Sequence, residues 1–439
     1  MSTPFLTAEC ARTHGGRALS WSGAVTRRSH LRLHSLALIP LVLCALHSAH
    51  CLPKFPSDAP LPRLAAAAED HAHAQGPQWL DSGLMGWLET LANSSWPRAP
   101  EKGHGAGPLG RAGRRRHGSA RRWLKRGAVK PNLVVSQDGT GDVTTLRRAA
   151  EIINGVPPSQ GWYVVHIRAG VYTDKVDIAR PMVALVGDGP TRTVITGSRS
   201  NADGFATWDT ATFSASGASF AAANIRFENT AGPYKDAGVA FRAVGDQSLL
   251  YRCHFSAFQD TLNAHSGRQY YRECRVEGAL DFIFGRDASA VFDKCRLDVR
   301  KWTGAAGFLG RSIITANGRT ARKGGGGFVF VDCAINARDP GARAVLGRPW
   351  KAYARVVFIN TYMSNVIDPV GWAQWNGINF RAKPFLAEIG SYGPGARRAY
   401  AEWVHPGKLA ARHAGPFLPD PFIQAHTWVG STPLHVPYP

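Results

Sequence analysis

The stretch from residue 251 to residue 295 decides the fold, and it reads YRCHFSAFQDTLNAHSGRQYYRECRVEGALDFIFGRDASAVFDKC. Cys253, Cys274 and Cys295 are spaced 21 residues apart, and Asp260 and Asp281 share that spacing. A period near 20 residues is too short for a propeller blade and fits one coil of a β-solenoid. The alternative is a chance recurrence of a few Cys and Asp residues.

Short apolar runs divided by Gly, Asp and Asn recur on both sides of this stretch. Each run has the length of a strand and is rich in β-branched or aromatic residues. Only 145–153 has the pattern of a helix. The sequence therefore predicts an all-β body of about a dozen coils from residue 128 onward. Its expected strands include 133–135, 162–167, 183–186, 220–227 and 328–331.

Stacked coils would bring Asp260 and Asp281 to one face, at the strand spacing of about 4.7–4.9 Å. Two close carboxylates do not both ionise readily, so one of them keeps its proton near neutral pH. The pair is compatible with acyl transfer through a covalent aspartyl intermediate. It is also compatible with a retaining glycosidase, or with a structural or cation-binding ladder. The spacing alone does not choose among these three.

The composition favours a folded, basic protein. The 439 residues are 44% hydrophobic, which excludes wholesale disorder. Lys and Arg number 52 against 31 Asp and Glu, for a net charge of +21. Residues 1–127 hold 17 Lys and Arg against 7 Asp and Glu, so residues 128–439 carry +11 of this charge. Such a balance favours a polyanion: nucleic acid, an acidic membrane surface or an acidic polysaccharide. No apolar run reaches the roughly 18 residues of a transmembrane helix.

The first third of the chain is expected to be a poorly ordered extension. In residues 1–51 a basic region precedes the apolar run 36–46 and a small-residue stretch, which is typical of a secretory signal. A buried strand or helix is the alternative for that run. Residues 52–127 are predicted to be a disordered linker or pro-segment. They contain the glycosylation sequon at Asn93 and basic runs that are typical of processing sites or linkers rather than of nucleic-acid patches.

A set of ordered motifs resembles the plant pectinesterases (pectin methylesterases). The resemblance runs from about residue 130 to the C-terminus. It implies a right-handed parallel β-helix over 128–439, in agreement with the 21-residue period. The motifs are FQDTL (258–262), GALDFIFG (278–285), LGRPWK (346–351), GVYTD (170–174), SQDGTGD (136–142), NTAGP (229–233), DP with GW (368–372) and GPGA (393–396).

The resemblance also implies an activity, namely removal of methyl esters from the galacturonate units of pectin. Asp281 would be the nucleophile, and Asp260 the general acid that protonates the departing methanol and then the base that activates water. Gln259 would bond the negative oxygen of the tetrahedral intermediate. Arg348 would hold Asp281 ionised and oriented. No cofactor and no metal are implied.

Two further positions match substrate contacts of the family. Trp350 would offer a flat apolar face to a sugar ring, and Thr207 aligns with a substrate-contacting threonine. Each has a structural alternative, since Trp350 could belong to the core and Thr207 could be a plain turn residue.

The sequence departs from the family pattern at several positions. A substrate or oxyanion Gln is replaced by Ala237, Asn263 stands where Tyr is usual, and Asp174 replaces Glu. One extra residue appears in the segment 286–289. Loss of an oxyanion donor costs about 10²–10³ in rate where the donor is fully used. The sequence therefore predicts an esterase of reduced or altered activity. The alternatives are a pectin-binding β-helix protein with little catalysis and a depolymerising glycosidase or lyase.

Cysteine use and partners complete these expectations. Two disulfides are expected in a secreted chain, for example Cys253–Cys274 and Cys295–Cys333 among the three pairings that the sequence permits, with four buried thiols as the alternative. The family's inhibitor-like helical domain carries paired cysteines, and 52–127 contains none. We expect a secreted, monomeric cell-wall protein that binds methyl-esterified pectin and a proteinaceous pectinesterase inhibitor. We expect it to bind neither nucleic acid nor, in its mature form, a membrane.

Overall fold

The computed structural model describes residues 130–304, 310–375, 384–396 and 401–437, all within one compact unit that spans Leu109–Pro439. The predicted signal region 1–51 and linker 52–127, with the Asn93 sequon, lie outside the described residues. In the part of the chain that is described, no helix is long and apolar enough to cross a membrane.

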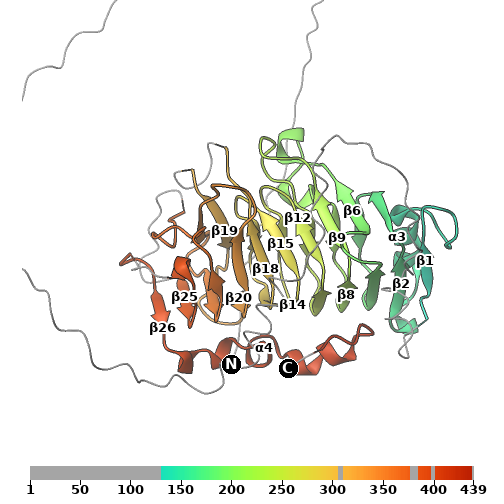
Figure 1. The fold of residues 1–439 in the computed structure, drawn as a ribbon. Helices are drawn as coiled ribbons and strands as arrows, with labels where there is room; N and C mark the ends of the chain where they lie inside the picture. Colours follow the sequence, from blue (N-terminus) through green and yellow to red (C-terminus); the bar gives the residue numbers. More distant parts are fainter. Residues whose placement is uncertain (1–129, 305–309, 376–383, 397–400, 438–439) are drawn as a thin grey trace, which may run out of the picture. The chain divides into compact units, whose positions relative to one another are not determined.

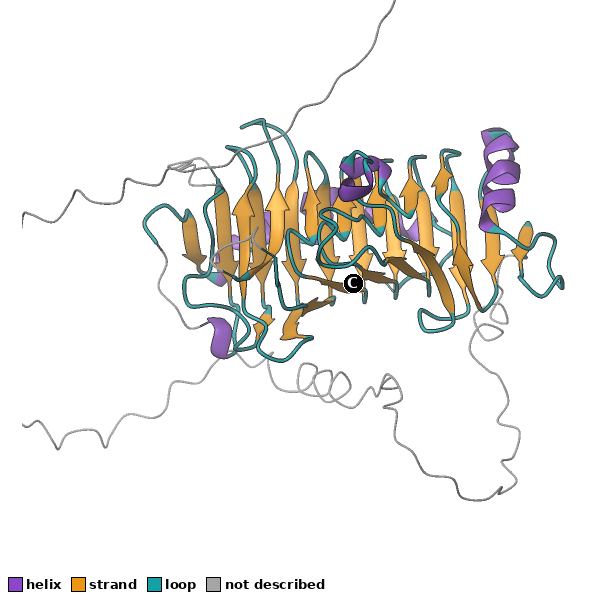
Figure 2. Ribbon diagram, turned by 90° about the horizontal axis from the view of Figure 1, so that it is seen from above, coloured by secondary structure: helices purple, strands orange, loops and turns teal. Residues whose placement is uncertain are grey.

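The fold is a parallel β-helix, as the sequence predicted, with the strands of successive coils stacked into three sheets (Figures 1 and 2). Every pairing between described strands is parallel, and each sheet takes one strand from most coils. Sheet 1 has eleven strands: β1 (Leu133–Val135), β2 (Tyr163–Ile167), β5 (Val183–Gly187), β8 (Phe220–Ala223), β11 (Ser248–Tyr251), β14 (Arg268–Arg272), β17 (Ser289–Asp293), β20 (Gly327–Val331), β23 (Arg355–Ile359), β25 (Phe385–Ile389) and β26 (Pro406–Leu409).

The other two sheets close the coils. Sheet 2 has eight strands: β3 (Gly170–Thr173), β6 (Thr193–Gly197), β9 (Arg226–Asn229), β12 (His254–Ser256), β15 (Arg275–Gly278), β18 (Arg296–Val299), β21 (Ala334–Ala337) and β24 (Tyr362–Met363). Sheet 3 has seven strands: β4 (Val176–Ile178), β7 (Phe213–Ala215), β10 (Phe241–Ala243), β13 (Leu262–Ala264), β16 (Ile283–Gly285), β19 (Ser312–Asn317) and β22 (Ala344–Pro349).

The 21-residue period holds in the central coils and fails outside them. Ser248 pairs with Gln269, and Arg268 with Ser289, each 21 residues further on. By contrast, Ala221 pairs with Leu249 after 28 residues, and Ser289 pairs with Gly327 after 38. Longer coils carry their extra residues in the connections between strands, so the sheets stay in register while the period varies.

The corner between sheets 1 and 2 divides one expected strand into two. The run 220–227 is broken at Asn224, whose φ of 60° is left-handed, so β8 ends at Ala223 and β9 begins at Arg226. A non-glycine residue rarely adopts this backbone unless the surrounding structure enforces it. The same corner recurs in later coils, at Arg252, Glu273, Lys294, Asp332 and Asn360.

Aromatic side chains stack inside the solenoid in the same register. The rings of Tyr271, Phe292, Phe330 and Phe358 follow one another at centroid distances of 4.5, 4.7 and 4.5 Å and are nearly parallel. All four are fully buried. Parallel pairing places like residues above one another, so each coil extends one continuous apolar core.

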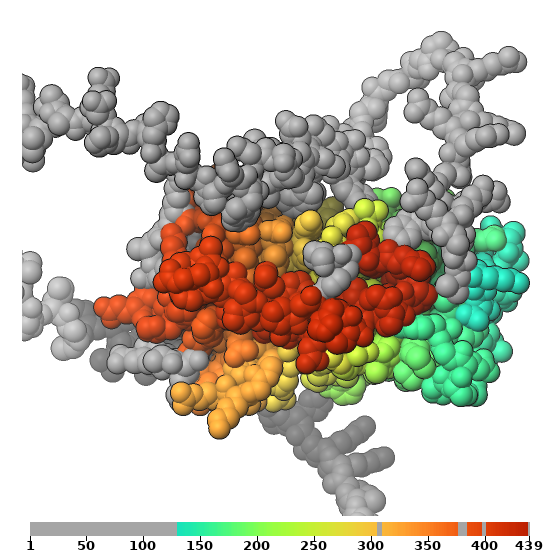
Figure 3. All heavy atoms as spheres, turned by 90° about the horizontal axis from the view of Figure 1, so that it is seen from below, coloured from blue at the N-terminus to red at the C-terminus, as the bar shows by residue number. Residues whose placement is uncertain are grey.

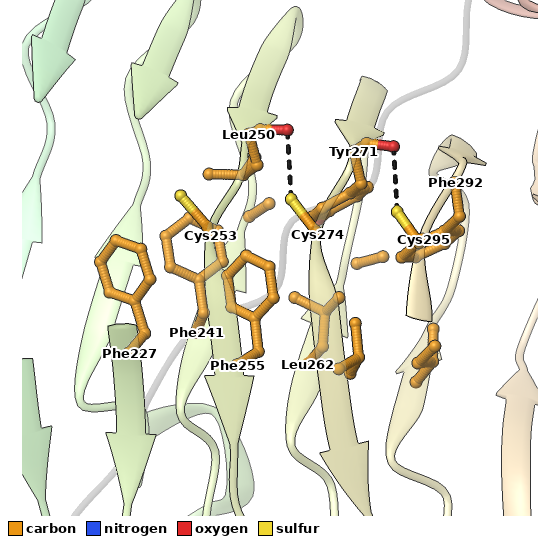
Figure 4. Close-up of a cluster of buried hydrophobic side chains, with 14 of the residues drawn as sticks. Phe227, Phe241, Leu250, Cys253, Phe255, Leu262, Tyr271, Cys274, Phe292 and Cys295 are labelled. Carbon is orange, nitrogen blue, oxygen red and sulfur yellow. Dashed lines mark hydrogen bonds between the residues drawn. The ribbon is translucent and has the colours of Figure 1, made fainter. Parts of the chain in front are cut away.

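The expected disulfides are absent from the structure, because Cys253, Cys274, Cys295 and Cys333 are all free and buried. Each follows a left-handed corner residue, so the four thiols occupy the same position in successive coils. Figure 4 shows Cys253, Cys274 and Cys295 pointing into the core. The Sγ of Cys274 donates to the carbonyl of Leu250 at 3.3 Å, and that of Cys295 to Tyr271 at 3.3 Å. The alternative of four buried thiols is therefore what the structure has.

Helix α3 (Leu146–Gly155) lies at the end of the solenoid that holds β1 (Figure 1) and confirms the helix expected at 145–153. The Oγ1 of Thr145 accepts from the N–H of Arg148, a side-chain cap of the first turn. A carboxylate of Asp174 accepts from the N–H of Leu146 at 3.0 Å. Asp174 therefore supports the helix terminus.

The C-terminal segment covers sheet 1 (Figure 3). It contains the short helix α4 (Pro419–Ile423) and 3-10 turns at Ala425–Thr427 and Val429–Ser431. Buried residues of this segment, such as Ile423 and Trp428, join a cluster with Tyr270, Val291 and Val329 on the outside of sheet 1. Sheet 1 is therefore buried on both faces, as parallel sheets usually are.

Removing one ring from the aromatic stack should weaken the whole solenoid. We expect Phe330→Ala to lower the free energy of unfolding by about 3–5 kcal/mol, because it leaves a cavity between Phe292 and Phe358. Urea denaturation of the purified protein measures this. Val171→Ala is the control, since that side chain is 57% exposed and should cost under about 0.5 kcal/mol. Equal costs for the two variants would contradict the stacked core.

Candidate active site

A row of side chains along the outer face of sheet 3 forms the floor of the candidate site. The central residues of β10, β13, β16, β19 and β22 pair in register, each one strand spacing from the next. A cleft of about 340 Å³ lies over the central residues of β13, β16 and β19 in this row. It is lined by Thr207, Trp208, Asp260, Asn263, His265, Asp281, Phe284, Gly285, Arg286, Ala316, Trp350 and Trp375.

The structure brings Asp260 and Asp281 into this cleft from neighbouring coils. Asp260 lies two residues before β13 and Asp281 two residues before β16, and both have left-handed φ values, 62° and 47°. Asp tolerates this conformation better than most residues. The N–H of Asp260 donates to the carbonyl of Leu280 at 3.0 Å, which ties the two turns together. The 21-residue spacing thus does place the two acids side by side.

Arg348 holds Asp281 by two parallel hydrogen bonds. Its Nε donates to one carboxylate oxygen at 3.0 Å and its Nη2 to the other at 2.5 Å. The guanidinium also lies over the ring of Trp375, 4.1 Å from the centroid. Such a two-point pair fixes the carboxylate in orientation as well as charge.

The pKa values of the two acids differ because their electrostatic environments differ. Burial raises the pKa of Asp281, and the bonds from Arg348 oppose that rise. Burial and the neighbouring Asp281 carboxylate raise the pKa of Asp260 much further, and only the more distant charge of Arg348 opposes them. When the pair holds one proton, it therefore resides on Asp260, and Asp281 is the ionised partner.

Trp350 and Thr207 both reach the cleft. Trp350 is half-buried and packs beside Trp375, with 6.2 Å between ring centroids. A Cβ at Gly318 would stand 2.4 Å from the Trp350 ring, so only glycine lets the ring lie this close to the chain. Thr207 opens a 3-10 turn, Thr207–Asp209, and its hydroxyl donates to the side-chain oxygen of Asn201 at 3.1 Å.

Gln259 and Ala237 are not among the residues that line the cleft. The Oε1 of Gln259 is buried and accepts no hydrogen bond from any described residue. Ala237 is fully buried in the preceding coil, where the N–H of the next residue, Gly238, donates to the carbonyl of Gln259 at 3.1 Å. Position 237, where the resemblance implies a Gln, is therefore next to Gln259.

Comparison with known proteins agrees with this geometry. The sequence profile of the Pectinesterase family matches residues 132–426. The chain belongs to the pectinesterase family. A pectinesterase of Petunia integrifolia is 40% identical over 290 residues, which cover 63% of this chain and 75% of that protein.

Relatives from Arabidopsis thaliana are longer than the region that aligns with this chain. The one named as pectinesterase/pectinesterase inhibitor 28 is 42% identical over 313 residues, which cover 69% of this chain. The chain spans between 41% and 55% of the length of three such relatives.

Solved pectin methylesterases share the β-helix. The structure of the carrot enzyme has a TM-score of 0.65 and 35% sequence identity, covering 71% of this chain and 98% of that one. A pectin methylesterase from Aspergillus niger has a TM-score of 0.58 and 26% identity, covering 69% and 97%.

Sequence reasoning missed several residues of the cleft. Trp375 supports both Arg348 and Trp350, and Trp208, 58% exposed, stands at the cleft. Trp375 lies three residues after Trp372 of the GW motif at 371–372, and Trp372 is fully buried. Proximity to a motif therefore does not distinguish a cleft residue from a core residue. Phe284 lies inside the GALDFIFG motif and could have been assigned from the alternation of faces along a strand.

No group of three or more His, Cys, Asp or Glu residues in the described ranges is arranged to hold a metal ion.

The buried proton of Asp260 has a consequence for stability. A carboxyl with a folded pKa above its unfolded value costs nothing below the unfolded pKa and destabilises increasingly as pH rises. We expect Asp260→Asn to raise the free energy of unfolding at pH 8 by at least about 1 kcal/mol, and to change it little at pH 4. Denaturation at both pH values measures this.

Asp368→Asn is the matched control. Burial opposes its ionisation, but bonds from Arg311 and Arg343, both 2.6 Å, hold the pKa of Asp368 below its usual range. This variant should therefore lose stability at pH 8. A loss of stability for Asp260→Asn at pH 8 would show that Asp260 is ionised in the folded protein.

Proposed function

We propose that the protein is a carboxylic ester hydrolase that removes methyl esters from homogalacturonan pectin and releases methanol. The observation that carries this proposal is the pair of unlike carboxyls in one cleft: Asp281 is held by Arg348, and Asp260 retains the proton. The family assignment supports the same reaction.

In the first half-reaction, a carboxylate oxygen of Asp281 attacks the carbonyl carbon of the ester. The carbonyl oxygen becomes negatively charged in the tetrahedral intermediate. When this collapses, the bond to the methoxy oxygen breaks and Asp260 delivers its proton to that oxygen, so methanol leaves. The product is an acyl-aspartyl anhydride on Asp281, with Asp260 now ionised.

In the second half-reaction, Asp260 takes a proton from a water molecule while the water oxygen attacks the acyl carbon. The anhydride bond to Asp281 breaks, and the released galacturonic acid loses the second proton of the water to solvent. Both acids then return to their starting states. Arg348 favours the ionised form of Asp281 at the beginning and at the end of the cycle, because its two bonds require a carboxylate.

Gln259 is the proposed donor to the negative oxygen of both intermediates. Its side chain makes no hydrogen bond with other described residues, so the amide is not committed to a structural role. Ala237 provides no second amide beside it. This absence favours a weakly active or inactive pectin-binding protein as the second candidate, because each lost oxyanion donor slows such reactions by about 10²–10³.

The substrate and location are part of the same proposal. An acidic polysaccharide suits a body with a net charge of +11, and Trp350, Trp375 and Trp208 give the cleft aromatic faces for sugar rings. The N-terminal pattern supports export, and we propose the cell wall as the destination, with the protein acting as a monomer. A proteinaceous pectinesterase inhibitor is a proposed partner.

Methanol release from methyl-esterified pectin tests the activity directly. We expect Asp281→Asn and Asp260→Asn each to lower kcat by about 10²–10⁴, because one removes the nucleophile and the other the proton donor. Asp298→Asn is the control, since that acid pairs with Arg275 and Arg296 on sheet 2, outside the cleft. Product chain length must stay constant; new reducing ends or unsaturated ends would indicate a glycosidase or lyase instead.

Restoring the missing amide distinguishes the two candidate functions. If one absent donor limits the rate, Ala237→Gln should raise kcat by about 10- to 10³-fold over the wild type. Ala237→Leu, similar in bulk but without an amide, should give no gain. Pectin binding without methanol release in both the wild type and the Gln variant would support the binding protein.

A further inference from the structure

The outer face of sheet 2 carries a layer of arginines, none of which lines the cleft. Residues along each strand of this sheet alternate between core and surface, and Phe255, Val276 and Leu297 belong to the core. The outward residues that begin four successive strands pair in register. They form one basic row along the solenoid: Arg226 on β9, His254 on β12, Arg275 on β15 and Arg296 on β18.

Two carboxylates lie beneath this layer. Both Glu277 on β15 and Asp298 on β18 are buried, although they are on the outward face of the sheet. Burial opposes the ionisation of Glu277, but its contact with His254 and the charge of Arg300 hold the pKa of this carboxyl below its usual range. The arginines therefore cover the acids, and a partner from solution meets guanidinium groups first.

The two acids hold three arginines close together. Arg275 contacts both, with its Nε 2.5 Å from an oxygen of Asp298 and its Nη2 3.1 Å from an oxygen of Glu277. The Nε of Arg296 donates to the other oxygen of Asp298, at 2.7 Å. The Nε of Arg338 donates, at 3.2 Å, to the same Glu277 oxygen that Arg275 contacts. We call these three arginines the sheet 2 cluster.

The sheet 2 cluster has more positive charge than the neighbouring acids neutralise. Arg300 adds a fourth guanidinium, whose Nη2 lies 2.6 Å from Glu277. Asp339 is a third acid and accepts from the Nη1 of Arg338 at 2.9 Å. Within the described part of the chain, four arginines therefore contact three carboxylates. Like charges that are held together in this way give the face a positive potential toward solvent.

Several N–H groups of the cluster have no hydrogen bond to any described residue. Arg296 bonds through Nε alone, so both of its Nη nitrogens are open. The Nη1 of Arg275 and the Nη2 of Arg338 are open as well. The three side chains are 44%, 34% and 41% exposed. These donors are accessible and already fixed in orientation, so a ligand that binds them loses little side-chain entropy.

We propose that Arg275, Arg296 and Arg338 form a second binding site, which holds a de-esterified stretch of homogalacturonan on sheet 2 while another stretch lies in the cleft. The inference rests on the proposed function, because the reaction in the cleft produces the carboxylates that this site binds. A guanidinium with open N–H groups matches the two oxygens of a carboxylate. A neutral methyl ester offers no such charge.

The basic row on sheet 2 favours a linear uronate polymer over nucleic acid. Its members follow one another at the strand spacing of about 4.8 Å, a step comparable to one sugar unit. The row contains no Phe, Tyr or Trp on which a base could stack. It runs from coil to coil, as the floor of the cleft does. A second attachment point of this kind raises the effective concentration of polymer at the cleft.

Binding of polygalacturonate to the full-length protein tests the site without requiring turnover. We expect the double variant Arg275→Gln/Arg296→Gln to weaken the affinity, measured by titration calorimetry, by roughly 10- to 100-fold, as for loss of hydrogen bonds to charged groups. The matched control is Arg148→Gln/Arg268→Gln, which removes two ion-paired charges elsewhere on the solenoid. Equal affinities of the two double variants would overturn the proposal.

A second measurement does not depend on an arginine variant that folds. In the Asp281→Asn background, where esters are not turned over, a saturating methyl-esterified trigalacturonide occupies the cleft. Polygalacturonate should still bind to this complex through sheet 2, and complete displacement by the trimer would contradict the second site. Single-stranded DNA of equal charge should bind at least about 10-fold more weakly than polygalacturonate. Equal or tighter binding of the DNA would overturn the assignment to a uronate polymer.

Methanol release distinguishes this proposal from the proposed esterase. Because sheet 2 lies outside the cleft, Arg275→Gln/Arg296→Gln should keep the wild-type kcat and the wild-type KM for the esterified trimer. The KM for partly de-esterified pectin should rise by about 3- to 10-fold, since only the polymer reaches both sites. An equal rise for the trimer would overturn the second site. Failure of the esterase would appear differently, as absent methanol release with arginine-dependent binding intact.

Discussion

The in-register pairing of one coil on the next is the constraint on which the rest of this structure depends. It places Tyr271, Phe292, Phe330 and Phe358 in one stack and the four cysteines in another. The same pairing carries the floor of the cleft, since the central residues of β10 to β22 follow one another along sheet 3. Because core and site share one register, a slip of one residue would disrupt both together.

The chemistry of the cleft depends on two aspartates that have different hydrogen-bond partners. Asp260 and Asp281 enter it from equivalent left-handed turns of adjacent coils. Only Asp281 receives the two bonds of Arg348, and this difference leaves the proton on Asp260. Two equivalent backbone positions thus hold one protonated and one ionised carboxyl, because only one of the two carboxyls is bonded to an arginine.

Sequence reasoning predicted the fold well wherever the coils are short. The 21-residue spacing of Cys253, Cys274 and Cys295 gave the strand pairing of the central coils, whereas connections such as that between Ser289 and Gly327 obscure the period. The expectation of disulfides was wrong. An even number of cysteines in a secreted chain favours disulfides, but here the thiols lie stacked in the core and donate to backbone carbonyls. Corner residues such as Asn224 were missed because their left-handed backbone follows from the bend between two sheets rather than from local preference.

By itself, the sequence determined which residues can do chemistry: two acids one period apart, an arginine and a tryptophan in one motif, and a missing amide at Ala237. The two acids follow from residue type and spacing, which a period of one coil converts directly into neighbours, whereas the arginine, the tryptophan and the missing amide follow from the resemblance to the pectinesterases. Only the tertiary structure decided which groups have partners. Arg348 bonds Asp281 across 67 residues, and Trp375 packs on Arg348 from another connection. Such pairings depend on side chains that meet between coils of unequal length, where sequence spacing no longer measures distance.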